Sequence, residues 1–153
     1  MVALTLNPID IEAVVAKLIT PASGGVNVFI GTTRNHSHGR EVTLLEYEAF
    51  EPMAIELMGD LERRAHEQWP LHGVVLVHRL GKVSIGEASV VVGVSASHRK
   101  EAFEACRYLI DSLKKEVPVW KREHFADGTV EWSGENQKSQ IKKQNKSKSE
   151  IKN

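Results

Sequence analysis

Two hydrophobic periods alternate along residues 1–137, and this alternation limits the folds that the chain can adopt. Apolar residues three or four positions apart predict helices, and short valine-rich runs bounded by glycine or proline predict strands. Helices are expected at residues 8–18, 52–69 and 97–116, and strands at 25–31, 42–48, 73–80, 88–95, 119–125 and 129–132. A helix followed by two strands, repeated three times, predicts a single α+β domain with largely antiparallel pairing.

Capping residues predict where the helices begin. Asn7 and Pro8 fit an N-cap and a first-turn proline, and Ser97 fits the N-cap of the third helix. The apolar face of that third helix is predicted to contain Ala102, Phe103, Cys106, Leu109, Ile110 and Leu113. The single cysteine of the chain therefore reads as a small buried hydrophobe and not as a nucleophile.

Charge is distributed unevenly, although the chain holds 20 basic and 20 acidic residues. Residues 138–153 contain six lysines and one glutamate, which leaves 14 basic and 19 acidic residues in residues 1–137. So polar a segment cannot bury enough apolar surface to order itself, and we expect a disordered tail after a domain spanning 1–137. A solvated extension is the more frequent role of such a tail, and an arm for an anionic surface is the alternative.

Several classes of partner are not expected. The body of the chain is acidic and no strand shows the interleaved aromatic residues of a base-stacking platform, which argues against nucleic acid. No apolar run approaches the roughly 18 residues that cross a bilayer, so no membrane is expected. The N-terminal residues lack the basic start and apolar run of a signal peptide, which favours a cytoplasmic protein.

Standard cofactor and metal motifs are absent from the sequence, including GxGxxG, the P-loop pattern and HExxH. His36 and His38 form the nearest metal-like pair, but no carboxylate or cysteine lies at ligand spacing. The sequence therefore predicts neither a metal site nor a bound cofactor.

Basic residues gather at the ends of the predicted elements: Arg34, His36, His38, Arg40, His98, Arg99, Lys114, Lys115, Lys121 and Arg122. Cations in a first helical turn oppose the helix dipole unless an anion is bound there, and free backbone N–H groups favour such an anion. Each cation alone also fits a solvated surface. Together they predict a pocket for a phosphate or carboxylate ligand.

Five segments between Gly25 and Trp132 form a more specific pattern. They are RNH at 34–36, WP at 69–70, HRLG at 78–81, the stretch VGVSASHRKEAFEACRYLIDSLKKEVPVWKRE at 92–123, and a hairpin ending in tryptophan. The most specific part combines cations at a helix start with two lysines seven residues apart around a proline. This pattern resembles the large (catalytic) subunit family of molybdopterin synthase.

The resemblance implies an α/β hammerhead with an additional antiparallel β-sheet. It implies a sulfurtransferase that makes the dithiolene of molybdopterin from cyclic pyranopterin monophosphate, with no metal and no cofactor. The implied partner is a small ubiquitin-like sulfur-carrier subunit, which delivers sulfur as a thiocarboxylate at its C-terminal Gly-Gly. The implied assembly is a homodimer at the centre of a heterotetramer.

The resemblance also assigns residues. It implies that Lys114 and Lys121 are catalytic, with Lys114 beside the thiocarboxylate and Lys121 beside the carbons that receive sulfur. The implied substrate-binding residues are Thr32, Thr33, Arg34, His98, Arg99, Lys114, Lys121, Arg122 and Glu123. Thr32 and Thr33 stand where relatives often carry a lysine and an apolar residue, so their roles stay open.

Two other functions remain alternatives. One is a scaffold that recruits a ubiquitin-like partner without catalysis, against which the presence of both lysines argues. The other is an anion-binding or RNA-binding module that uses the same cations together with the lysine-rich tail.

Overall fold

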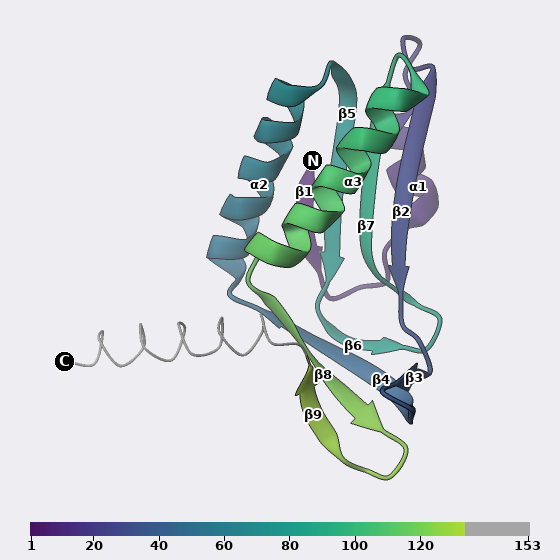
Figure 1. Cartoon of the computed structure of the whole chain (residues 1–153), viewed down its shortest axis with the longest axis vertical. Coiled ribbons are helices and arrows are strands. Elements are labelled where there is room, and N and C mark those ends of the chain that lie inside the picture. Colours follow the sequence, from purple (N-terminus) through teal and green to yellow (C-terminus); the bar gives the residue numbers. More distant parts are fainter. Residues whose placement is uncertain (134–153) are drawn as a thin grey trace, which may run out of the picture.

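The computed structural model of the chain describes residues 1–133 (Figure 1). Both the predicted tail at 138–153 and residues 134–137 lie outside the described residues. The helices are α1 (Ile11–Leu18), α2 (Glu51–Gln68) and α3 (Arg99–Glu116). The strands are β1 (Val2–Thr5), β2 (Gly25–Thr32), β3 (His36–Ser37), β4 (Arg40–Ala49), β5 (Leu71–Arg79), β6 (Gly81–Ser84), β7 (Ala88–Ala96), β8 (Val119–Phe125) and β9 (Val130–Ser133).

The first sheet has the strand order β1-β5-β7-β2 and is covered on both faces. Strand residues alternate between the faces, so Val74 and Leu76 of β5 pack with α2 and α3, whereas Val75 and Val77 pack with α1. Figure 1 shows α2 and α3 on one side of this sheet and α1 on the other. The valine-rich strands are buried on both sides for this reason.

The second sheet contains β3-β4-β8-β9, with β6 also paired to β4. Its small core consists of Val42, Leu45 and Phe125, with Tyr47 packed against them. Figure 1 places this sheet beyond the ends of α2 and α3, so the long strand β8 leads directly away from α3. The two sheets with their helices form the predicted α+β domain, a hammerhead with an additional antiparallel sheet.

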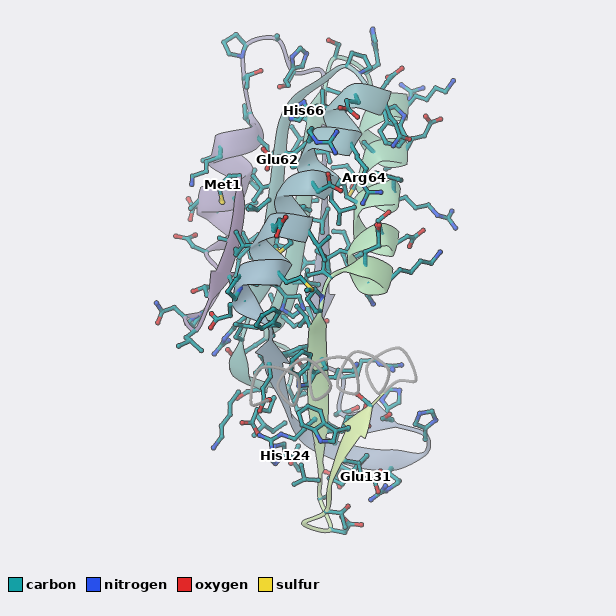
Figure 2. All side chains as sticks on the ribbon, turned by 90° about the vertical axis from the view of Figure 1, so that its left-hand side faces the viewer. Met1, Glu62, Arg64, His66, His124 and Glu131 are labelled. Carbon is teal, nitrogen blue, oxygen red and sulfur yellow. The ribbon has the colours of Figure 1, made fainter. Side chains whose placement is uncertain are left out.

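Apart from one pair, the strands that the structure describes pair antiparallel, as predicted. The exception is β1, which runs parallel to β5 and was not expected from the sequence. The Met1 ammonium group donates to the Glu62 carboxylate of α2 (2.8 Å) and to the Val74 carbonyl (2.7 Å). Met1 and Glu62 are labelled in Figure 2. These bonds anchor β1, which is too short to be predicted from its hydrophobic pattern.

Two predicted helix starts are wrong. Asp10, not Asn7, caps α1, because its carboxylate accepts a hydrogen bond from the Ala13 N–H (3.0 Å). His98, not Ser97, occupies the N-cap of α3 and makes no capping bond with its side chain. The Ser97 hydroxyl instead lies 2.8 Å from Nε2 of His72.

The apolar face of α3 is confirmed except for Phe103, which is 60% exposed. Cys106 is buried as predicted, its thiol 3.6 Å from the Val92 carbonyl, and burial raises its pKa. Among residues 1–133, no helix is both long enough and apolar enough to cross a membrane.

Candidate functional site

A pocket of about 590 Å³ lies where the first sheet, the end of α3 and the second sheet meet. Its lining includes four groups that carry charge, namely Arg34, Lys114, Lys121 and Glu123. The other lining residues are Gly31, Thr32, His36, Val42, Leu45, Tyr47, His78, Ser89, Val90, Leu113, Val117 and Val119. Three cations facing one cavity make it suited to an anionic ligand of small-molecule size.

The fold brings the two lysines together at the junction of α3 and β8. Lys114 lies in the last turn of α3, and the chain then turns sharply, with the Val119 N–H donating to the Val117 carbonyl (2.8 Å). Lys121 follows as the third residue of β8 and pairs across the sheet with Tyr47 of β4. Lys114 and Lys121, seven residues apart in the sequence, thus line the same pocket.

The alternation of β8 decides which of its charged residues face the pocket. Lys121 and Glu123 point toward the same side, as do their cross-strand partners Tyr47 and Leu45. Arg122 points to the other side, where its guanidinium lies 3.1 Å from Glu46 and 3.2 Å from Glu48. The expectation that Arg122 lines the pocket with Glu123 is therefore wrong for its side chain, because adjacent strand residues face opposite ways.

The pocket alters the acid–base behaviour of Lys121. Its pKa is lowered, mainly because burial disfavours the charged ammonium; Lys114 and Arg34 lower it further, and Glu123 opposes them. Glu123 is itself only 8% exposed and supplies a buried negative charge beside this amine. Lys121 is thus more able to release a proton near neutral pH than an ordinary surface lysine.

The two predicted threonines at the end of β2 differ in their access to the pocket. Thr32 and Arg34 line the pocket. Thr33 is 3% exposed, and its backbone bonds Glu87 and Gly86 (3.1 and 2.9 Å). A direct contact between the Thr33 hydroxyl and a ligand in this pocket is therefore not supported.

His98 and Arg99 lie in a second pocket, together with Gly24, Ser97 and Lys100. They lie at the start of α3, whereas Lys114 lies in its last turn. Fifteen positions at a rise of 1.5 Å put about 22 Å between Arg99 and Lys114. Within one chain, the expected grouping of His98 and Arg99 with Arg34 around one substrate does not occur.

Comparison with known proteins places the chain among relatives. The model of the MoaE protein family matches residues 4–116. The chain belongs to this family. It is 41% identical over 131 residues to the molybdopterin synthase catalytic subunit of a Nostoc species, covering 85% of this chain and 79% of the relative.

Solved structures agree with the MoaE assignment. Molybdopterin synthase from Staphylococcus aureus superposes with a TM-score of 0.81 at 35% identity, covering 86% of this chain and 95% of that one. A Helicobacter pylori structure shares the fold at 22% identity, with a TM-score of 0.71 and coverage of 88% and 90%. That structure is a complex of subunits 1 and 2 of molybdopterin-converting factor.

Three polar pocket residues of this MoaE chain were missed by the sequence analysis: Tyr47, His78 and Ser89. A usable signal existed for His78, because a histidine among the buried valines of a predicted strand needs a polar partner. Tyr47 and Ser89 carry no comparable signal, since both residue types are common in exposed strands.

His36 and His38 lie apart from any group of possible metal ligands that the structure describes. Within residues 1–133 no group of three or more His, Cys, Asp or Glu side chains is arranged to hold a metal ion. His36 lines the MoaE pocket, and its Nδ1 lies 3.0 Å from the side-chain oxygen of Asn35. His38 adopts a positive φ of 51° in the turn between β3 and β4.

Proposed function

We propose that this chain is the catalytic subunit of a molybdopterin synthase. It transfers sulfur from the C-terminal thiocarboxylate of a small ubiquitin-like partner to cyclic pyranopterin monophosphate, forming the dithiolene of molybdopterin. The observation that carries the proposal is the convergence of Lys114, Lys121 and Arg34 on one cavity. The naming of its relatives supports the same reaction.

The pocket residues fit the charges that such a reaction must handle. A guanidinium binds phosphate oxygens with paired hydrogen bonds, which suits Arg34 to the cyclic phosphate. We assign Lys114 to the thiocarboxylate, where its ammonium stabilises negative charge developing on the acyl group. In each transfer a carbon–sulfur bond forms on the substrate and a carbon–oxygen bond of the same carbon breaks, its oxygen leaving with the electron pair and taking up a proton. On the partner's acyl carbon the carbon–sulfur bond breaks, and an oxygen from water replaces the sulfur.

Lys121 is assigned to proton transfer at the carbons that receive sulfur. Its lowered pKa makes the amine more ready to give up a proton than an ordinary lysine, and the amine can then take a proton back. Glu123 lies on the same face of β8 and in the same pocket, so it can keep part of the Lys121 population charged. Thr32 completes the proposed substrate contacts with its hydroxyl.

The proposed partner enters from outside this chain. The Helicobacter pylori protein that shares this fold forms a complex of two subunits, which supports a small sulfur-carrying partner here. A homodimer within a heterotetramer belongs to the same proposal. The expected cytoplasmic location, and the absence of nucleic-acid and membrane partners, stay predictions.

A homodimer would explain the separation of the two cationic pockets. Strand β2 is the outer strand of the first sheet, and Val26, Phe29 and Ile30 on it are exposed. Antiparallel pairing of β2 with β2 of a second copy would set the first residue of one strand, Gly25, beside the last residue of the other, Thr32.

Such pairing would place the second pocket of one copy beside the lysine-lined pocket of the other. A side-chain carbon at Gly25 would come within 3.2 Å of the Arg99 backbone, so the start of β2 lies directly against the start of α3. His98 and Arg99 of one copy would therefore approach Thr32 and Arg34 of the other. In this arrangement all the proposed substrate contacts except Thr33 and Arg122 gather around one ligand.

A turnover assay tests the proposed reaction. The purified chain is mixed with a thiocarboxylated ubiquitin-like partner and cyclic pyranopterin monophosphate, and molybdopterin is measured as its oxidised fluorescent derivative. Lys114→Ala and Lys121→Ala should each lower the rate by about 10²- to 10³-fold, the cost of removing one charge-stabilising group. Lys115→Ala is the matched control, because Lys115 is exposed and does not line the pocket.

Other results of this assay would change the proposed mechanism or the proposed function. Product formation that survives both substitutions would remove the two lysines from the mechanism. A stable complex with the partner but no product would favour the scaffold. If there is neither complex nor product, the anion-binding module becomes the better description.

A further inference from the structure

His78, near the end of β5, is a buried pocket residue without an assigned role. It is 6% exposed, and its ring meets the ring of Tyr47 edge-on at 4.9 Å. Its Nδ1 lies 2.8 Å from the backbone carbonyl of Arg79. Because a carbonyl oxygen only accepts hydrogen bonds, Nδ1 must carry the proton, and the neutral ring then has its lone pair on Nε2.

The surroundings keep this ring neutral. Burial is the main cause that lowers the pKa of His78 to about 4; Lys114 and Lys121 lower it further, and the bond to Arg79 opposes them. The other polar groups in the pocket lining are Thr32 from β2, Arg34 from the loop after it, His36 from β3, Tyr47 from β4, Ser89 from β7 and Glu123 from β8. At neutral pH, Nε2 therefore remains a hydrogen-bond acceptor.

Acceptors are scarce in this pocket. Arg34, Lys114 and Lys121 are donors when charged, and each attracts anionic groups of a ligand. Glu123, His36 and His78 are the lining residues that present a strong acceptor, and of the two histidines only His78 is buried. Among the described residues Nε2 of His78 has no hydrogen-bond partner. A ligand with a phosphate and a ring bearing N–H groups needs both kinds of contact.

We propose that Nε2 of His78 accepts a hydrogen bond from an N–H group of the substrate's heterocycle while the nearby cations hold its phosphate. This makes His78 a specificity-determining residue, which distinguishes a pterin phosphate from other phosphates. The inference rests on the proposed function, because that function supplies the heterocyclic phosphate.

Two substitutions separate the two nitrogens of the ring. An asparagine amide ends near the position of Nδ1, so His78→Asn keeps a donor for the Arg79 carbonyl and loses the acceptor in the pocket. A glutamine amide reaches the position of Nε2, so His78→Gln keeps an acceptor in the pocket and loses the backbone bond. His66→Asn is the matched control, since His66 is exposed on α2, away from this pocket (Figure 2).

Binding to the full-length chain is measured by calorimetry with cyclic pyranopterin monophosphate and, separately, with inorganic phosphate. His78→Asn should raise the dissociation constant of the pterin phosphate about tenfold, the usual effect of one hydrogen bond, and leave that of phosphate unchanged. His78→Gln should bind the pterin phosphate nearly as well as the parent chain but melt at a lower temperature. His66→Asn should match the parent chain with both probes.

The contrary results are distinct. If His78→Asn binds the pterin phosphate as tightly as the parent chain, His78 is not a specificity residue, whatever the reaction. Equal weakening of both probes would mean that the substitution damages the pocket as a whole, which also overturns the inference. If the parent chain itself binds the pterin phosphate no better than phosphate, the proposed function fails and takes this inference with it.

Discussion

At the scale of single residues, the buried imidazole of His78 links folding stability to pH. Its pKa is about 4 in the folded chain, against about 6.5 for an exposed histidine. Between these values the unfolded chain binds a proton that the folded chain does not. The free energy of unfolding should therefore decrease by about 3 kcal/mol as the pH falls from 7 to 4, and His78 adds only a few tenths of a kcal/mol below that.

Comparison with His78→Gln isolates this effect. Glu46, Glu87 and Asp127 have lowered pKa values and also lose stabilising charge in acid, but they do so in both proteins. Urea unfolding at several pH values should show the parent chain losing its advantage over the variant as the pH falls from 7 to 4. Two parallel curves would show that the imidazole of the folded chain titrates like an exposed one.

At the scale of elements, α3 begins in a way that favours ligand binding over helix stability. His98 makes no side-chain cap, and Arg99 and Lys100 follow in a first turn where the dipole favours negative charge. His98→Asp should supply a cap and raise the free energy of unfolding by about 1 kcal/mol. The same carboxylate should repel the substrate phosphate and raise its dissociation constant about tenfold or more.

Phe50 at the start of α2 provides a control for this prediction, because it is also an N-cap without a side-chain bond. Phe50→Asp should bring a similar gain in stability by urea unfolding, with no effect on binding of the pterin phosphate. A His98→Asp chain that is both more stable and equally good at binding would remove His98 from the substrate site.

The elements with strong periodicity could be predicted from sequence, and those formed by distant pairing could not. Helices 51–68 and 99–116 and the valine-rich strands carry their own patterns, so the prediction locates them within two residues or so. The four residues of β1 are too few for a pattern, and their strand exists because β5 lies beside them. Motif resemblance groups Arg122 with Lys121 and Glu123, but the alternation of strand faces turns its side chain toward Glu46 and Glu48.

At the scale of the whole molecule, the candidate site depends on distances that the sequence does not contain. Lys114 and Lys121 are close in the chain and meet in one pocket, whereas His98 and Arg99 belong to the same long helix and lie at its far end. Motif resemblance names residues that act together without saying whether one copy of the chain supplies them all. The proposed β2 pairing would bring His98 and Arg99 of one copy to the lysine-lined pocket of the other.

Charge on the free edge of β2 should prevent that pairing. Ile30→Lys places an ammonium where two copies would join, and a lysine on an edge strand disfavours strand addition. Light scattering should then report a monomer, while circular dichroism still shows the folded chain. Ile19→Lys changes an exposed isoleucine just after α1 and should leave the dimer intact.

Mixing two inactive variants tests whether the pocket is shared. Arg99→Ala and Lys114→Ala would each damage every pocket of their own dimer. If each pocket combines Lys114 of one copy with Arg99 of the other, a mixed dimer has one doubly altered pocket and one intact pocket. Random exchange makes half the dimers mixed, so about a quarter of the parent activity should return. Activity that stays at the level of the separate variants would mean that each pocket belongs to one chain, and the β2 pairing would lose its functional basis.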